Sequence, residues 1–167
     1  TVDELYSPQN FEEIENMKNN GIFVVASAGN EGNSAIRFPA SCEHSFSVSS
    51  TKFDERRSSF SSFNNNVDIA APGGQNSEDL DGNGSGDGVM AYSFKNSSYD
   101  GESYKGLQVY NGTSMAAPHV SAYFAILKYL EPDLSHDQLK QYLRSGNLTK
   151  DIGNPGKDDF YGYGLMD

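Results

Sequence analysis

The segment that most constrains this chain runs from Asn111 to Val120 and reads Asn-Gly-Thr-Ser-Met-Ala-Ala-Pro-His-Val. An Asn-Gly pair forms turns readily, and Ser114 stands between that turn and a long apolar run. This order places a hydroxyl at the N-terminus of a helix, where unpaired N–H groups and the helix dipole stabilise negative charge. A serine that attacks a carbonyl and generates an oxyanion gains from this position. We therefore interpret Ser114 as a candidate nucleophile.

A second segment, residues 21–32, reads Gly-Ile-Phe-Val-Val-Ala-Ser-Ala-Gly-Asn-Glu-Gly. It predicts a short buried strand that stops at the glycine-flanked Asn30. An uncharged amide at the mouth of a buried strand can point its N–H at a developing oxyanion. The alternative is that the Gly-Asn pair only turns the chain after the strand. The presence of the serine segment favours the oxyanion interpretation.

These two segments resemble the nucleophile and oxyanion signatures of the subtilisin-like serine proteases, the subtilases. Other stretches are similar to the same family in the same order, from about residue 10 to the last residue. They are an aromatic-Pro-Ala turn at 38–40, a strand pair at 56–63 and 67–73 with its Ala-Pro-Gly turn, and a closing Gly-x-Gly segment at 160–167. The resemblance implies an α/β, three-layer fold in which helices flank a mostly parallel sheet. It also implies that Ser114 is the nucleophile and Asn30 the oxyanion-hole residue.

The aspartate and histidine of the catalytic triad have no matching context in this chain. A subtilase places them before the serine, in the order Asp, His, Ser. Asp3 and His44 have that order, but no buried strand precedes Asp3, and His44 lies in a turn before a predicted strand at 46–50. His119 follows Ser114 by five residues, so on a helix their side chains diverge by roughly 140° and sit ~7.5 Å apart along the axis. A general base must come within about 3 Å of its proton, so we interpret His119 as structural.

The resemblance therefore implies that residues 1–167 are the C-terminal portion of a single subtilase catalytic domain, with an acidic, glycine-rich insertion around 74–106. The parent would be a serine endopeptidase that hydrolyses peptide bonds in peptide or protein substrates. Its aspartate and histidine would come from an N-terminal portion that this chain lacks. We expect the isolated chain to be catalytically inactive. The alternative is a non-catalytic pseudoprotease or a calcium-stabilised binding module that kept the serine loop.

The resemblance also implies a substrate pocket. Ser27, Ala28 and Gly29 would wall the pocket for the side chain that precedes the cleaved bond. Glu31 and Arg37 would lie near its floor. If Arg37 faces the pocket unpaired, acidic side chains should be cleaved best, whereas a pairing with Glu31 would be a different specificity feature.

Part of the insertion carries oxygen-bearing side chains at alternate positions from Asp79 onward. Counted from Asp79, the sixth residue is a glycine, Gly84. That spacing resembles the first nine positions of a calcium loop. The twelfth position, where a bidentate glutamate is expected, is Met90. A flexible acidic surface loop explains the same letters, so both alternatives stay open. The candidate ligands are Asp79, Asp81, Asn83, Ser85 and Asp87.

Three segments have helical patterns. Residues 10–21 are amphipathic, and residues 114–131 are apolar on nearly every face, which predicts a helix buried among other layers. Ser135 begins a capping box for a third helix that runs through Leu143. His136 lies beside this cap and is expected to be solvated.

Composition excludes several kinds of partner. A net charge of -11 argues against nucleic-acid binding. No apolar run approaches the ~18 residues that suggest a membrane span. The family resemblance implies secretion and no organic cofactor. Cys42 is the only cysteine; it is either a small buried apolar residue or one half of a disulfide with an upstream cysteine, as in some secreted subtilases.

Overall fold

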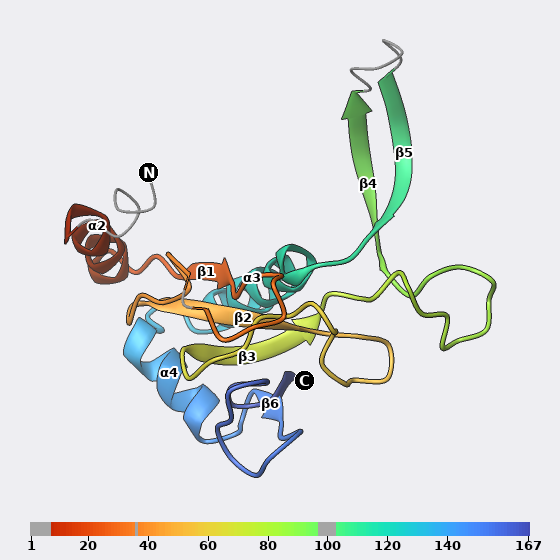
Figure 1. Cartoon of the computed structure of the whole chain (residues 1–167). Helices are drawn as coiled ribbons and strands as arrows, with labels where there is room; N and C mark the ends of the chain where they lie inside the picture. Colours follow the sequence, from red (N-terminus) through yellow and green to blue (C-terminus); the bar gives the residue numbers. More distant parts are fainter. Residues whose placement is uncertain (1–7, 36, 97–102) are drawn as a thin grey trace.

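The computed structural model describes residues 8–35, 37–96 and 103–167 (Figure 1). Its main sheet has the strand order β1-β2-β3-β7-β6. The parallel neighbours are β1 (Val24–Ser27), β2 (Ser45–Thr51), β3 (Val67–Pro72) and β7 (Leu165–Met166), and the short β6 (Thr149–Lys150) pairs antiparallel with β7. Helices flank this mostly parallel sheet, which confirms the predicted α/β fold. β1 lies at the edge, so one side of its backbone has no partner strand in the described chain.

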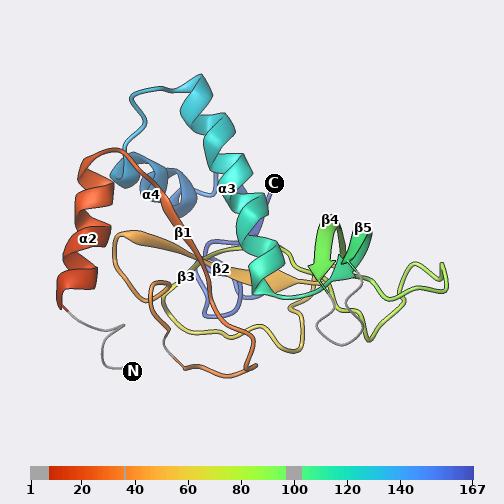
Figure 2. The same ribbon diagram turned by 90° about the horizontal axis from the view of Figure 1, so that it is seen from above.

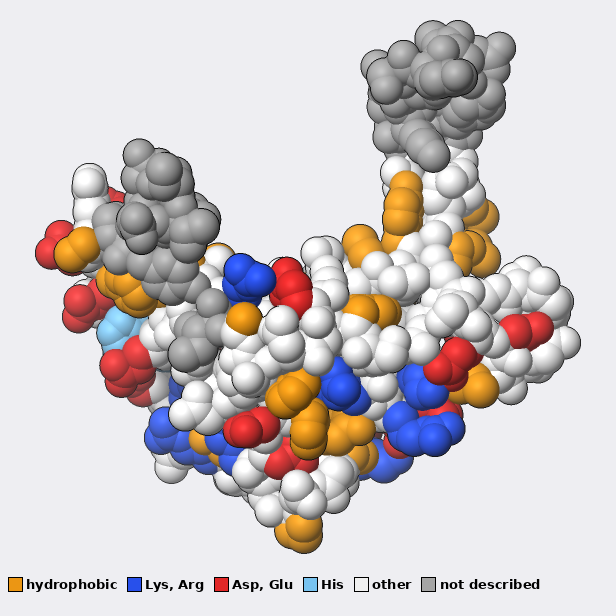
Figure 3. Space-filling model, in the orientation of Figure 1, with side chains coloured by type: hydrophobic (Ala, Val, Ile, Leu, Met, Phe, Trp, Pro, Cys, Tyr) orange, Lys and Arg blue, Asp and Glu red, His pale blue; other side chains and the backbone are white. Residues whose placement is uncertain are grey.

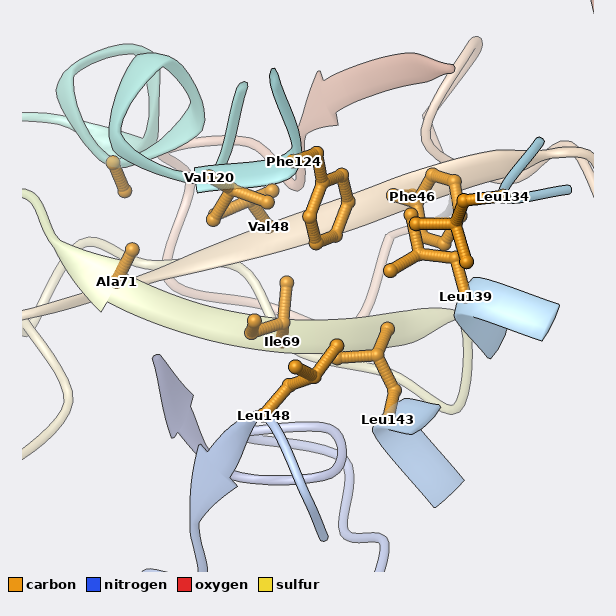
Figure 4. Close-up of a cluster of buried hydrophobic side chains, with 11 residues drawn as sticks. Phe46, Val48, Ile69, Ala71, Val120, Phe124, Leu134, Leu139, Leu143 and Leu148 are labelled. Carbon is orange, nitrogen blue, oxygen red and sulfur yellow. The ribbon is translucent and has the colours of Figure 1, made fainter. Parts of the chain in front are cut away.

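Helices α3 (Thr113–Leu130) and α4 (His136–Arg144) supply the core with apolar side chains, and α2 (Pro8–Asn19) lies beside β1 (Figure 2). Phe124 of α3 stacks edge-on against Phe46 of β2 at a centroid distance of 4.8 Å (Figure 4). Each aromatic or aliphatic side chain buried here removes its apolar surface from water, worth about 1.5–3 kcal/mol. The fully buried members of this core are Phe46, Val48, Ile69, Ala71, Ala116, Val120, Phe124, Leu134, Leu139 and Leu143.

The prediction that the helix at 114–131 is buried on nearly every face is wrong. Ala116, Val120 and Phe124 recur every four residues and face the sheet. On other faces Ile126, Tyr129 and Leu130 are 58%, 83% and 67% exposed. The physical reason is that the described elements cover only one side of α3. An apolar surface of this kind usually marks a site of contact with another chain segment or molecule.

His136 was expected to be solvated, and this prediction is also wrong. The residue is 4% exposed, and its ring centroid lies 4.7 Å from that of Phe46. The predicted capping box is present, with Ser135 and Gln138 bonded reciprocally. His136, Leu139 and Leu143 share the inward face of α4 because they are three and four residues apart. Burial lowers the pKa of the His136 imidazole.

The stretch 56–63 forms no strand apart from a single bridge between Thr51 and Arg57, so the predicted strand pair consists of β3 alone. Three Ser hydroxyls in this region hold the loop instead: Ser50 and Ser58 lie 2.8 Å apart, and Ser61 accepts the Ser50 N–H at 3.0 Å. The insertion holds an unpredicted hairpin of β4 (Val89–Asn96) and β5 (Ser103–Tyr110).

Cys42 is a buried free thiol, as the first of its two interpretations requires, and burial raises its pKa. The disulfide alternative needs a second cysteine outside this chain and stays a prediction. Among the residues described, no helix has both the length and the apolar character needed to cross a membrane.

A buried ion pair fixes α4 to the sheet. Lys140 Nζ lies 2.7 Å from Asp68 Oδ1 and also donates to the Ser45 carbonyl at 2.9 Å. Asp68 Oδ2 accepts the Ser47 N–H at 2.9 Å. Burial lowers the pKa of Lys140, and the Asp68 carboxylate partly offsets this effect. Removing the carboxylate would leave the ammonium without its compensating charge.

We therefore expect Asp68→Asn to lower the free energy of unfolding by about 3–5 kcal/mol, the cost of breaking a buried pair from one side. Urea or guanidinium denaturation measures this change. The exposed Asp133 makes no ion pair with the described residues, so Asp133→Asn is the matched control and should stay within about 0.5 kcal/mol. A loss below about 1 kcal/mol for Asp68→Asn would contradict this account.

Candidate active site

Ser114 is the second residue of α3, and its side chain is exposed at the C-terminal end of the parallel strands. Gly112 precedes the helix with φ of 151°, a conformation that side-chain-bearing residues rarely adopt. Its N–H donates to the Gly73 carbonyl at 2.9 Å, and its carbonyl accepts the N–H of Met115 at 2.9 Å. These bonds fix the turn onto the end of β3. No acidic residue lies in the first helical turn, so the positive end of the dipole is not neutralised locally.

Asn30 follows β1 and reaches the same helix end. Its Oδ1 accepts hydrogen bonds from the Thr113 N–H at 2.8 Å and the Thr113 hydroxyl at 2.9 Å. A backbone N–H can only donate, so the oxygen of the Asn30 amide must face Thr113. Nδ2 therefore points the other way, and it has no hydrogen-bond partner within the described chain. The amide is thus an oriented donor with both hydrogens unused.

Gly112 shows how close the two donors lie. A Cβ built on Gly112 would be 3.6 Å from both Nδ2 and Oδ1 of Asn30 and 3.7 Å from the Ser114 backbone nitrogen. Both nitrogens therefore flank one small volume beside the Ser114 turn. Thr113, Met115 and Ala116 have hydrogen-bond partners for their N–H groups, whereas the Ser114 N–H has none among the residues described. The Ser114 turn thus carries a backbone N–H without a partner among the described residues, and the Asn30 amide lies beside it.

Thr113 is a functional residue that the sequence reasoning missed. Besides holding Asn30, its hydroxyl lies 3.3 Å from both the N–H and the carbonyl oxygen of Gly29. Thr113 is fully buried, and a buried hydroxyl needs hydrogen-bond partners of this kind. A threonine at the first position of a helix, directly before Ser114, is the signal that could have identified it.

No histidine in the described chain can serve as the base for Ser114. His119 Nδ1 lies 2.7 Å from the Met115 carbonyl oxygen, in keeping with its interpretation as a structural residue. His44 directly precedes β2 and stacks on His136 at the opposite end of the strands from Ser114. Seven strand residues span roughly 20 Å, far beyond the reach of proton transfer. Asp3 lies outside the described residues.

The three residues predicted to wall the pocket, Ser27, Ala28 and Gly29, form one continuous segment at the end of β1. Ser27 is half-buried, and the N–H of the buried Ala28 donates to the Val48 carbonyl at 2.9 Å. Gly29 has φ of 114°, and a Cβ there would lie 2.7 Å from Glu31 Oε2 and 3.0 Å from Ser62 Oγ, so no side chain fits. Glycine at this position keeps the surface beside Asn30 open.

Arg37 is paired with Glu31 rather than free. The Arg37 Nη2 to Glu31 Oε1 distance is 3.4 Å, and Ser62 Oγ donates to Glu31 Oε2 at 3.1 Å. Both charged side chains are about half exposed, so the attraction is screened and weak. The condition for an acidic preference, an unpaired Arg37, is therefore not met in this conformation.

The acidic loop brings three of its five candidate ligands together. One oxygen from each of Asp79, Asp81 and Asp87 lies within 4.8 Å of the others. Backbone N–H groups of Asn83 and Gly84 donate to this cluster, so the loop is internally ordered. Asn83 uses its Oδ1 to accept the Ser85 N–H at 2.8 Å, which leaves that oxygen only partly available to a cation. Met90 belongs to β4, so no carboxylate comes from the twelfth position.

The sequence profile of the Subtilase family matches residues 3–164 of this chain. Subtilisin BL of Lederbergia lenta is 33% identical over 146 residues, which are 87% of this chain and 44% of that protein. The minor extracellular protease Epr of Bacillus subtilis is 31% identical over 147 residues, which are 87% of this chain and 19% of that protein. The chain thus spans less than half the length of these relatives.

A solved protease structure also resembles this chain in fold. A protease of Pseudoalteromonas arctica PAMC 21717 superposes with a TM-score of 0.78 at 32% identity. The match covers 96% of this chain and 45% of that protease.

Proposed function

This chain belongs to the subtilase family of serine proteases, and from that premise we propose that it supplies the nucleophile and the oxyanion hole of a serine endopeptidase. The observation that carries the proposal is that the Ser114 N–H and the Asn30 amide, both without an acceptor among the described residues, lie close together at Gly112, at the turn that carries Ser114. These groups supply the nucleophile and the oxyanion stabilisation of acyl transfer through a serine, which also requires a general base.

In the proposed reaction, Ser114 Oγ loses its proton to a base and attacks the scissile carbonyl carbon. The carbonyl π electrons move to the oxygen, which becomes an oxyanion. The Ser114 N–H and Asn30 Nδ2 donate to that oxygen, and the N-terminus of α3 adds a favourable field. When the intermediate collapses, the carbon–nitrogen bond breaks and the amine leaves with a proton. Water then hydrolyses the ester on Ser114.

We propose that the histidine and the aspartate come from another portion of the enzyme. Two surfaces support a contact with such a portion. The outer face of α3 exposes Ile126, Tyr129 and Leu130, and Ile22 before β1 is 53% exposed. The edge of β1 also presents unpaired backbone groups, which a further strand could use. β1 lies on the upper side of the sheet in Figure 1, where Figure 3 shows a hollow next to the β4–β5 hairpin.

The substrate is a peptide or protein, bound with the side chain before the cleaved bond against Ser27, Ala28 and Gly29. Glu31 and Arg37 form the polar floor as an ion pair. Because Arg37 is neutralised, the pocket should not select acidic side chains. Secretion is part of the proposal, and the name of the extracellular relative Epr supports it.

Calcium binding by the loop of residues 79–87 is a second part of the proposal. Carboxylate oxygens are the ligands that calcium prefers, and Asp79, Asp81 and Asp87 already converge. With Asn83 and Ser85 they would hold the ion and stabilise the fold without taking part in catalysis. For a site of about 10⁻⁴ M affinity, 10 mM calcium would stabilise by about 2.7 kcal/mol, or roughly 5–10 °C in Tm.

Differential scanning calorimetry in calcium and in EDTA measures this shift. Asp81→Asn should remove most of it, whereas Asp159→Asn, a change at an exposed aspartate outside the loop, should not. Equal melting temperatures in calcium and in EDTA would show that the loop is only a polar surface turn.

A fluorophosphonate probe tests the proposed function as a whole, because it phosphonylates an activated serine. The complete enzyme should be labelled at Ser114, and the isolated 167 residues should not. The competing candidate is a pseudoprotease or binding module that kept the serine loop. A complete protein that is folded and never labelled would favour that candidate.

A further inference from the structure

The β4–β5 hairpin stands away from the rest of the molecule as a separate two-stranded sheet (Figures 1 and 2). β5 ends at Tyr110, four residues before Ser114. Asn111 holds the base of the hairpin in place, since its Oδ1 accepts the Asn76 N–H at 3.2 Å. Anything bound to this hairpin is therefore held close to the serine turn.

One face of the hairpin is apolar and uncovered. Met90 lies opposite Val109, and Tyr92 lies opposite Leu107. Directly opposed residues share a face of an antiparallel pair, so these four side chains form one surface, the apolar hairpin face. Their exposed fractions are 63%, 42%, 73% and 64% in that order. An isolated two-stranded hairpin is marginal in water, so a sheet with such a face gains from a partner.

The part of the hairpin nearest the serine turn favours an extended, hydrophobic partner. None of the residues 89–93 and 106–110 carries a charge, and the charged residues of the two strands, Lys95 and Lys105, lie toward the other end. Each strand also has one edge that is not paired in the sheet, and its N–H and C=O groups can bond a further strand. Backbone pairing accepts many sequences, while the apolar face selects for hydrophobic side chains.

A cavity of about 660 Å³ adjoins the base of this face. Met90 and Val109 line it together with Phe53 and Pro72. Phe53 is 64% exposed, so one side of the cavity continues the apolar surface of the hairpin. The charged residues that also line the cavity are Lys52, Glu55, Asp81 and Asp87. A hydrophobic side chain of a bound segment would have room to enter it.

We infer that the apolar hairpin face is an exosite, which binds an extended hydrophobic segment of the enzyme's own protein substrate outside the pocket beside Ser114. This inference rests on the proposed peptidase function. The position next to the nucleophile decides between occupants: Val109 is five residues before Ser114, at most ~18 Å along an extended chain. A substrate held there would present nearby bonds to Ser114. Extended, uncharged polypeptide is also what exposed strand edges bind.

The test compares two substrates of the complete enzyme. One is β-casein, an extended hydrophobic protein, and the other is a tetrapeptide p-nitroanilide, which is too short to reach the hairpin. The variant carries Tyr92→Thr and Leu107→Thr, since threonine keeps the β-propensity while removing the apolar groups. We expect kcat/KM for casein to fall about tenfold through KM, and kcat/KM for the anilide to stay unchanged. The matched control, Ala91→Thr with Gln108→Thr on the opposite face, should change neither.

Three results would overturn the exosite. Equal losses on both substrates would mean that the face packs inside the enzyme. Unchanged casein hydrolysis would mean that substrate does not use the face. A wild-type dimer in sedimentation that the Tyr92 and Leu107 changes dissociate would assign the face to a second copy. If the wild type cleaves neither substrate and is not phosphonylated, the proposed peptidase function is wrong, and the exosite, which depends on it, is wrong as well.

Discussion

Replacing Ser114 with alanine in the complete enzyme is expected to lower kcat by about 10⁶-fold. In subtilisin, a protease of the same family, removal of the serine has an effect of this size, which sets the expected magnitude. The physical reason is that alanine has no nucleophile, while the two donors can still polarise a carbonyl. Because the Ser114 side chain is exposed and no described residue hydrogen-bonds to it, the fold and peptide affinity should not change. Single-turnover kinetics and inhibitor binding measure the two quantities separately.

Ser121 provides a matched control on the same helix. It is exposed, and its hydroxyl bonds only to the Ala117 carbonyl at 3.1 Å among the described residues. Ser121→Ala should leave kcat within about twofold of the wild type. If Ser114→Ala kept more than about one-hundredth of the wild-type rate, Ser114 would not be the nucleophile.

Replacing Asn30 with leucine is expected to lower kcat by about 10²–10³-fold and to leave KM nearly unchanged. The same change of donor in subtilisin gives this magnitude. In the proposed mechanism Asn30 Nδ2 donates only to the oxyanion that forms in the transition state, so its loss should raise the barrier without weakening substrate binding. Steady-state kinetics on a p-nitroanilide peptide measures both parameters.

The Asn30→Asp variant distinguishes the loss of the Nδ2 donor from the loss of the hydrogen bonds that Asn30 Oδ1 accepts from Thr113. An aspartate keeps an oxygen for the Thr113 N–H and hydroxyl, which lie 2.8 and 2.9 Å from Asn30 Oδ1. It cannot donate when ionised, and its charge repels the oxyanion. We expect a loss at least as large as for leucine, with an unchanged melting temperature. Asn20→Ala, at an exposed amide bonded only locally, should have no kinetic effect. A normal kcat for Asn30→Asp would exclude an oxyanion role.

The positions of Ser114 at the start of a helix and of Asn30 after a strand could be predicted from sequence, because local signals set them. The Asn-Gly turn and the apolar run fix where α3 begins, and the glycines around Asn30 mark where β1 ends. The sequence does not indicate how the start of α3 is joined to the end of β1. Thr113 makes that connection over a separation of 83 residues, and no local pattern predicts a contact of that range.

One error has the same origin. The apolar pattern of residues 114–131 predicts a buried helix, yet Tyr129 is 83% exposed, because burial depends on which elements surround the helix. The spacing of His136 with Leu139 and Leu143 was available in the sequence and indicates an inward face. The hairpin could also have been recognised, since Met90 and Tyr92 alternate with the smaller Ala91 and Ser93 in the pattern of a strand.

A crystal structure of the complete enzyme after reaction with a peptidyl phosphonate tests the central claim most directly. The claim is that the Ser114 hydroxyl, the Ser114 N–H and the Asn30 amide act on one carbonyl group. We predict a bond between phosphorus and Ser114 Oγ, with the phosphonyl oxygen about 2.7–3.1 Å from both Asn30 Nδ2 and the Ser114 nitrogen. Phosphorus on another residue, or an Asn30 amide turned away from the phosphonyl oxygen, would contradict it.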